Sequence, residues 1–519
     1  MNELPKGWAA TKWNDITAVD GFRRGPFGGN LKKSCFVDEG YAVYEQYAPI
    51  NNDCRTFRYF VTKDKFNELA SFQVNNGDFL ISCSGTMGRI TCVPEGAPLG
   101  VINQALLRIR LQQGYIYPEY FLWLFKSPMI QSLVLNKSVG GAIQNLAAVK
   151  ELKEIPLPLA PLPEQKRIVE KLDEVLAQVD TIKARLDGIP DLLKRFRQSV
   201  LASAVSGKLT EEWRVDNSQQ VSLSDIEDAF VSGWESEKRK DFLAKGKTPK
   251  NESWKAKCPT PYLPTDNESE FVGDLPATWL LTSVDQLTKF VKDGPHYSPK
   301  YVDDGIEFIS GRNITIKGID FSSSKYISQE LHEELSVRCK PEFNDVLLTK
   351  GGTTGVSCVN KHTHEFNVWV HVAVLRVTSE EIIMPEYLSL FFNSSIGYAQ
   401  SQNYTHGVAN RDLGLKRMVK ICLGLPSLSE QTEIVRLADQ YLALADTIEA
   451  QVTKAQARVD KLTQTILAKA FRGELVPQDE NDEPADKLLE RIAQARAEAE
   501  ALAKAAKKAE AAKKRAAKA

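Results

Sequence analysis

The chain has 519 residues, of which 43% are hydrophobic and 26% are charged, so it is too long for one ordinary domain and too apolar for wholesale disorder. It contains no run of about 18 apolar residues and no apolar stretch behind its first residues, which argues against a transmembrane span and a secretory signal. The formal net charge is −1, so affinity for nucleic acid would have to come from local basic surface or from partner subunits.

Residues 1–158 are predicted to form a β-rich domain. Short strand-like runs occur at 79–82 and 106–111, and clusters of Gly, Asn, Asp and Pro separate them. An apolar patch at 120–125 has helical spacing.

Residues 159–214 are predicted to form a long helical spacer. Apolar residues alternate there in steps of four and three, a heptad pattern that is typical of a seam between helices. The seam positions are Ile168, Leu172, Val175, Val179, Ile182 and Leu186. Gly188 and Pro190 are expected to kink or break this helix. The polar, proline-dotted residues 215–274 are interpreted as a connector with one short helix near 226–240.

Residues 275–426 are predicted to form a second β-rich domain, with strand-like runs at 346–349 and 370–377 and a helical patch at 387–392. A second helical spacer follows at 427–475, with seam positions Ile434, Tyr441, Ile448 and Val452. Ser427 and Glu430 predict a capping box at its start, and Gly473 follows its end. The tail, 476–519, is predicted to be helical, and its lysine-rich end is either a basic arm on DNA or a solubilising helix.

The second half of the chain repeats the first. LPEQKRIVEKLDEVLAQVDTI and LSEQTEIVRLADQYLALADTI match without a gap at a separation of 266 residues, and SVLASAVSGKL matches TILAKAFRGEL in the same register. The predicted fold class is α+β, with two β-rich domains joined by two long antiparallel coiled-coil helices in a pseudo-two-fold internal repeat. The alternative is two ordinary helical hairpins in separate domains.

Motifs for catalysis and for metal binding are missing from the sequence. Gly207-Lys208 lacks the upstream glycine of a phosphate-binding loop, and 351–355 lacks the lysine. The chain contains no Pro-Pro, which the Asn/Asp-Pro-Pro-aromatic stretch of an amino-methyltransferase requires. The six histidines show no ligand pattern, and the eight cysteines form no C-x-x-C pair, as is typical of a reduced cytoplasm. We therefore expect no catalytic residue, metal or cofactor in this chain.

Two similar globules on a helical spacer suit a partner that presents two half-sites at a fixed separation, as DNA does. Divergent loops would read two different half-sites through base edges, whereas repeated basic and small residues would hold phosphates. The pattern therefore favours an asymmetric, split DNA target.

Five phrases, in order along the chain, carry a family resemblance. They are RRGPFGGNLKKS (23–34), GDFLISCSGTMGRI (77–90), PLPLAPLPEQKRIVEKLD (156–173), VKDGPHYSPKYVDDGIEFI (291–309) and FRGELVPQDENDEPADKLLERI (471–492). With them, nearly the whole chain resembles the specificity subunit of a type I restriction–modification system. The resemblance implies that 1–158 and 275–426 are target-recognition domains.

The same resemblance implies a subunit that is not itself catalytic and binds no cofactor. It would bind double-stranded DNA and dock two modification subunits, which use S-adenosylmethionine to methylate adenine N6 at a bipartite site. Restriction subunits of the complex would use ATP and Mg²⁺ to translocate and cleave DNA. The two helical spacers would dock these partners, and the protein would be cytoplasmic, away from membranes.

Candidate DNA contacts combine the resemblance with side-chain chemistry, because Arg and Lys suit guanine edges and Asn and Gln suit adenine edges. In the first domain they are Arg23, Arg24, Lys32, Lys33, Ser84, Thr86, Arg89, Gln144 and Asn145. In the second domain they are His296, Tyr297, Lys300, Arg312, Asn313, Lys350, Thr353, Thr354, Asn410 and Arg411. The glycines Gly28, Gly29, Gly85 and Gly88 would let the backbone approach the duplex. For any single residue, the alternative is that it only solvates the surface or makes a turn.

Three other functions stay open at this stage. One is an enzyme that carries its own nuclease or methyltransferase chemistry, against which the missing motifs argue. Another is a coiled-coil scaffold whose globules bind proteins. The third is a specificity subunit that serves modification alone.

Overall fold

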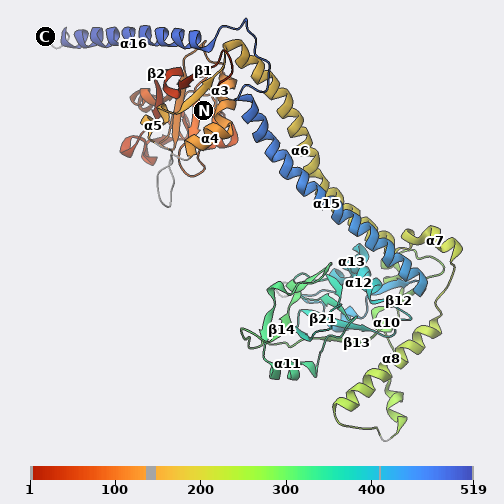
Figure 1. Ribbon diagram of the computed structural model, residues 1–519. Coiled ribbons are helices and arrows are strands. Elements are labelled where there is room, and N and C mark those ends of the chain that lie inside the picture. Colours follow the sequence, from red (N-terminus) through yellow and green to blue (C-terminus); the bar gives the residue numbers. More distant parts are fainter. Residues whose placement is uncertain (1–3, 136–145, 147, 250, 408–410, 517–519) are drawn as a thin grey trace. The chain divides into compact units, whose positions relative to one another are not determined.

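The computed structural model describes residues 4–135, 146, 148–249, 251–407 and 411–516 (Figure 1). The chain divides into two units, one formed by Met1–Asp187 with Thr453–Ala519 and the other by Gly188–Val452. Each unit holds one β-rich domain and part of each of two long helices. Within the described residues, no helix is both long enough and apolar enough to cross a lipid bilayer.

The first β-rich domain contains two packed sheets. The four-stranded sheet has the order β2 (Thr17–Arg24), β10 (Leu106–Leu111), β7 (Phe79–Ser82), β8 (Ile90–Cys92). The five-stranded sheet has the order β3 (Phe36–Val37), β5 (Phe60–Val61), β4 (Tyr41–Tyr44), β9 (Gly100–Ile102), β6 (Gln73–Val74). Phe79 and Ile81 share a hydrophobic cluster with helix α3 (Pro118–Lys126), whereas Leu80 shares one with the five-stranded sheet. Because neighbouring residues of a strand face opposite sides, the four-stranded sheet is the middle layer.

The second domain repeats this arrangement. Its four-stranded sheet has the order β13 (Thr288–Asp293), β21 (Val372–Val377), β18 (Val346–Thr349), β19 (Ser357–Val359), which corresponds strand for strand to the first domain. Its second sheet has the order β17 (Lys325–Ile327), β14 (Ile306–Ile309), β20 (Phe366–Val368). Helix α12 (Pro385–Asn393) corresponds to α3. The strands and helical patches predicted in both domains are confirmed, although the last strand begins at Val372 instead of residue 370.

Two long helices, α6 (Leu162–Val205) and α15 (Leu428–Ala470), run through both units. In the first unit, the early part of α6 and the late part of α15 share one cluster, and Lys183 pairs with Asp460 at 2.9 Å. In the second unit, the late part of α6 and the early part of α15 share a cluster, and Arg197 pairs with Asp446 at 2.7 Å. The two helices are therefore antiparallel, as predicted (Figure 1).

The predicted seam is only partly covered. Ile168, Leu172, Val179, Ile434 and Val452 are buried, and Val175, Leu186 and Ile448 are partly buried. Ile182 is 46% exposed and Tyr441 is 37% exposed. Two helices cover only a narrow stripe of each other, so apolar residues beside that stripe stay in water.

Helix α6 also corrects the expectation of a break at Gly188 and Pro190, because it continues through both residues. Proline removes one backbone hydrogen bond, and on an exposed helix water can take the freed carbonyl.

A glutamine at the start of each long helix clamps the helix to its domain. Gln165 donates its Nε2 to the carbonyl of Ala160 at 2.9 Å, and its Oε1 accepts from the backbone of Tyr117 at 2.9 Å. Gln431 does the same in the second unit, where its Oε1 accepts from the backbone of Met384 at 2.8 Å. Both glutamines are fully buried, which explains why this position repeats.

The glutamate before each glutamine is buried as well, and it corrects the predicted capping box. The Ser427 hydroxyl does accept from the backbone of Glu430 at 3.3 Å. The Glu430 carboxylate, however, accepts from Thr210 at 2.8 Å, from Arg214 at 2.9 Å and from the indole of Trp279 at 2.9 Å. It therefore joins the helix to the domain and to the segment after α6.

Part of the segment interpreted as a connector packs as a helix on the second domain. Helix α8 (Leu223–Ala244) is longer than predicted, and it contacts α10 (Val284–Leu287) and β13. In the first unit, α16 (Ala485–Ala516) contacts the corresponding elements, η1 (Trp13–Ile16) and β2. Ile226 and Ile492, 266 residues apart, are buried in these two places. The internal repeat therefore includes a cap helix.

Candidate nucleic-acid interface

In the first domain, the ends of β2, β4 and β7 meet the turn between β9 and β10. A Cβ atom at Gly25, directly after β2, would lie 1.8 Å from the carbonyl oxygen of Asn103. Gln46, after β4, donates its Nε2 to the Ser84 hydroxyl at 3.1 Å and to the Ser84 carbonyl. The parallel pairing of β4 with β9 brings these segments together, because parallel strands end at the same edge of a sheet.

The predicted residues of the first domain are accessible or partly accessible at this edge and along the segment after β2. Lys32, Lys33, Thr86 and Arg89 are exposed, and Arg23, Arg24 and Ser84 are half-buried. The Arg23 guanidinium lies 5.9 Å from the ring centre of Phe72, and that of Arg24 lies 5.7 Å from that of Phe27. These cation–π contacts orient both guanidinium groups. Gly85 and Gly88 have φ values of +63° and +72°, which side chains other than glycine rarely adopt.

The second domain builds the same edge. A Cβ atom at Gly294, directly after β13, would lie 1.8 Å from the carbonyl oxygen of Val368. The backbone of Lys350, after β18, donates to the carbonyl of His371 at 2.9 Å. The predicted residues His296, Tyr297, Lys300, Arg312, Thr353 and Arg411 are exposed.

Lys350 is a correction, because its side chain is enclosed. It is 2% exposed, and its Nζ lies 2.7 Å from the carboxylate of Asp412 and 3.4 Å from that of Asp293. A buried charge needs such partners. Lys350 therefore ties loop ends together instead of facing a duplex.

Two further predicted contacts are interior. Asn313 is 1% exposed, and its side chain donates to the carbonyl of Asp320 at 2.8 Å and accepts from the backbone of Ser310 at 2.9 Å. Thr354 is 4% exposed. Both shape the loops behind the surface. Gln144, Asn145 and Asn410 lie outside the described residues.

The two edges differ in charge at equivalent positions. Arg24 directly precedes Gly25 in the first domain, and Asp293 directly precedes the equivalent Gly294 in the second. Likewise, Cys83 follows strand β7 and Lys350 follows the equivalent strand β18. In the first domain, burial raises the pKa of the Cys83 thiol to about 12, and the nearby charge of Arg24 opposes that rise. In the second domain, Asp293 is buried.

Asp293 also joins two exposed side chains of the second edge. Its carboxylate lies 2.6 Å from Arg338 and 3.4 Å from His296. The position of the basic Arg24 in the first edge is therefore taken in the second edge by an aspartate that also pairs with the buried Lys350.

Sequence reasoning missed the segment after β4. Gly40 and Gly305 precede equivalent strands, and counting from them places Tyr47 at the position of Arg312. Arg312 was predicted as a contact, whereas Glu45, Gln46 and Tyr47 were not. Extending the repeat through the glycines that precede β4 and β14 would have found them.

Among the described residues, no group of three or more His, Cys, Asp and Glu side chains is arranged to hold a metal ion. The arrangement offers surfaces for binding in each unit: loops at one sheet edge, and apolar residues on the long helices.

Together the repeated domains and helices define a protein with two units of similar fold in one chain, whose equivalent loops carry different side chains. The family model of the type I restriction modification DNA specificity domain matches residues 5–191 and 232–455. The specificity subunit of the type I restriction enzyme EcoBI from Escherichia coli is 32% identical over 81% of this chain and 80% of its own length. That of EcoKI from Escherichia coli strain K12 is 30% identical over 95% of this chain and 97% of its own. The chain therefore belongs to the type I restriction–modification specificity family.

Solved structures share the fold. The HsdS subunit from Thermoanaerobacter tengcongensis superposes with a TM-score of 0.54 at 15% identity, over 91% of this chain and 98% of its own. A chain from a structural study of complex assembly and conformational transition of the type I R-M system superposes with a TM-score of 0.55 at 16% identity, over 91% and 100%.

Proposed function

We propose that this chain reads a bipartite, asymmetric DNA target for a type I restriction–modification complex, with one half of the target bound by each β-rich domain. The observation that carries the proposal is the pair of equivalent sheet edges with different side chains. The same strand order supports the same mode of docking on a duplex, whereas the different loops support different base sequences.

The long helices support a second role, the docking of partner subunits. In the first unit, Ile182 and Leu462 are 46% and 45% exposed, and in the second unit Leu192 and Leu444 are 56% and 50% exposed. Exposed apolar side chains on a repeated helix pair suit two copies of one partner. We propose that the partners docked there are modification subunits, which use S-adenosylmethionine, and that restriction subunits, which use ATP and Mg²⁺, join the same complex. The chain itself would contribute recognition and no catalysis.

The test is to express this chain with its genomic neighbours and map adenine methylation in the host DNA by long-read sequencing. We expect methylation at one split, asymmetric motif, and its loss when this chain is omitted. Co-purification of the partners without motif-restricted methylation would leave the docking role standing and contradict the reading role.

A further inference from the structure

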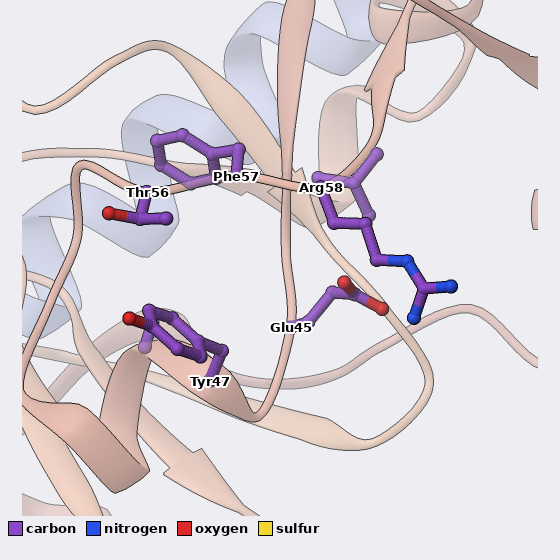
Figure 2. Close-up of a pocket in the computed structure, with 7 residues that line it drawn as sticks. Glu45, Tyr47, Thr56, Phe57 and Arg58 are labelled. Carbon is purple, nitrogen blue, oxygen red and sulfur yellow. The ribbon is translucent and has the colours of Figure 1, made fainter.

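A cavity of about 320 Å³ opens in the first domain beside the candidate DNA-binding edge. Figure 2 shows the rings of Tyr47 and Phe57 on opposite sides of this space, with Glu45 and Arg58 together at one end and Thr56 at the other. The volume lies at the lower end of the range for small-ligand sites, roughly 300–1,000 Å³. Two facing aromatic side chains are the walls that a flat, π-rich ligand prefers.

The polar end of the cavity can recognise an edge of such a ligand. Burial raises the pKa of the Glu45 carboxyl, and the charge of Arg58 and a hydrogen bond from Asn103 at 3.4 Å oppose that rise. The Arg58 guanidinium stacks 4.9 Å from the ring centre of Tyr59, which holds it in place. A carboxylate acceptor and a guanidinium donor therefore lie side by side.

The position of the cavity connects it to DNA. Glu45 follows β4 directly, and Gln46 is bonded to Ser84 in the loop after β7. In the second domain, Arg312 takes the place of Tyr47, and the positions of Phe57 and Arg58 fall in the serine run 322–324. The pair of facing aromatic side chains, Tyr47 and Phe57, therefore occurs in the first domain and has no counterpart at the equivalent positions of the second.

We propose that this cavity captures one guanine of the half-site bound by the first domain, turned out of the duplex stack and held between Tyr47 and Phe57. Guanine carries two adjacent N–H donors, at N1 and N2, for the Glu45 carboxylate, and its O6 acceptor lies on the same edge for Arg58. Bases that leave the stack are read in this way, by their Watson–Crick edge and by aromatic stacking. The inference rests on the proposed function, because it requires the domain to bind a duplex.

The experiment uses the purified complex and a duplex that carries the mapped target, treated with bisulfite without denaturation. Bisulfite converts unpaired cytosines only, so the cytosine opposite a captured guanine should convert in the complex and stay protected in free DNA. In Tyr47→Ala and Phe57→Leu the conversion should disappear, and affinity should fall roughly 5- to 150-fold, the range for losing one base-stacking contact. The matched control is Phe343→Ala, another exposed aromatic residue, which lies before β18 in the second domain and should change neither result.

A second measurement tests the edge contacts without removing volume. Inosine lacks the N2 amino group of guanosine. Inosine in place of the guanine opposite the reactive cytosine should therefore weaken binding by the wild-type complex and have little effect on binding by Glu45→Gln. A complex that methylates its motif but leaves every cytosine protected would overturn the capture and leave the proposed function intact. Absence of any motif-restricted methylation would overturn both.

Discussion

Buried charge pairs recur at equivalent positions of the two domains. Asp78 accepts from Arg110 at 2.6 and 2.7 Å, and Asp345 accepts from Arg376 at 2.8 Å through both carboxylate oxygens. Each aspartate is at most 1% exposed, and each arginine lies on the neighbouring strand. In each domain the pair connects the start of one strand, β7 or β18, to the neighbouring strand, at the end of the sheet opposite the candidate DNA-binding loops.

Arg376→Met should destabilise the second domain, because it leaves the Asp345 carboxylate buried without its guanidinium. Removing one partner of a buried pair costs about 3–5 kcal/mol of the free energy of unfolding. The measurement is chemical unfolding of the purified chain. Arg312→Met, which removes an exposed arginine of the same domain, should stay within about 0.5 kcal/mol of the wild type. Equal effects of the two substitutions would show that the buried pair contributes nothing specific.

At the scale of elements, α9 (Asp266–Val272) is attached to the second domain through Glu268. Its carboxylate accepts from the hydroxyl of Tyr404 at 2.8 Å and from that of Tyr262 at 2.9 Å. Burial alone would raise the pKa of Glu268, but hydrogen bonds from Thr265, Tyr404 and Tyr262 outweigh it and hold the pKa at about 2. The folded state therefore favours the charged carboxylate.

This shift predicts a pH-dependent effect of Glu268→Gln. A folded-state pKa below the unfolded value of 4.5 adds stability above about pH 5, and the gain is lost as the pH falls toward 2. At pH 7 we expect the variant to be less stable by about 1–2 kcal/mol, below the full linkage value because the carboxylate is partly exposed. The difference should fall to roughly half near pH 3. Urea unfolding at several pH values measures it.

Glu270→Gln, on the exposed side of the same helix, provides the control and should show no such pH trend. A Glu268→Gln effect that stayed constant from pH 7 to pH 3 would contradict the assignment of the low pKa to Glu268.

At the scale of the whole molecule, the two long helices should set the gap between the half-sites. Adding one heptad to α6 after Asp187 and one to α15 after Val452 keeps the seam in phase and lengthens each helix by about 10.5 Å. At about 3.4 Å per base pair, the preferred gap should grow by roughly three base pairs, with each half-site sequence unchanged. Methylation mapping reads both quantities. Undiminished preference for the original gap would contradict the idea that the helices act as a spacer.

The two domains should also be exchangeable independently. Replacing 290–410 with the corresponding segment of a relative should change one half of the methylated motif and leave the other half as it was. The reason is that this segment carries the loops of the second sheet edge, whereas the first edge is built from residues before 110. A change in both halves would show that the domains do not read DNA separately.

The sequence alone determined the repeat, the main strands, the two long helices and the family, because period, spacing and repeated phrases are local properties of a chain. It did not determine which candidate residues face water. Lys350 looks like a DNA contact until its partners Asp293 and Asp412 are known, and both come from distant segments. The cap formed by α8 was missed for a similar reason, since a few buried residues such as Ile226 hold a largely polar helix.

Only the tertiary structure decided where the loops converge. The parallel pairing of β4 with β9 joins residues far apart in the chain and places Glu45 beside Asn103, while the next residue, Gln46, contacts Ser84. No local pattern encodes that pairing, because it depends on how two sheets pack across a shared core. The aromatic cavity exists for the same reason: Tyr47 and Phe57 face each other across it because the chain folds back between β4 and β5.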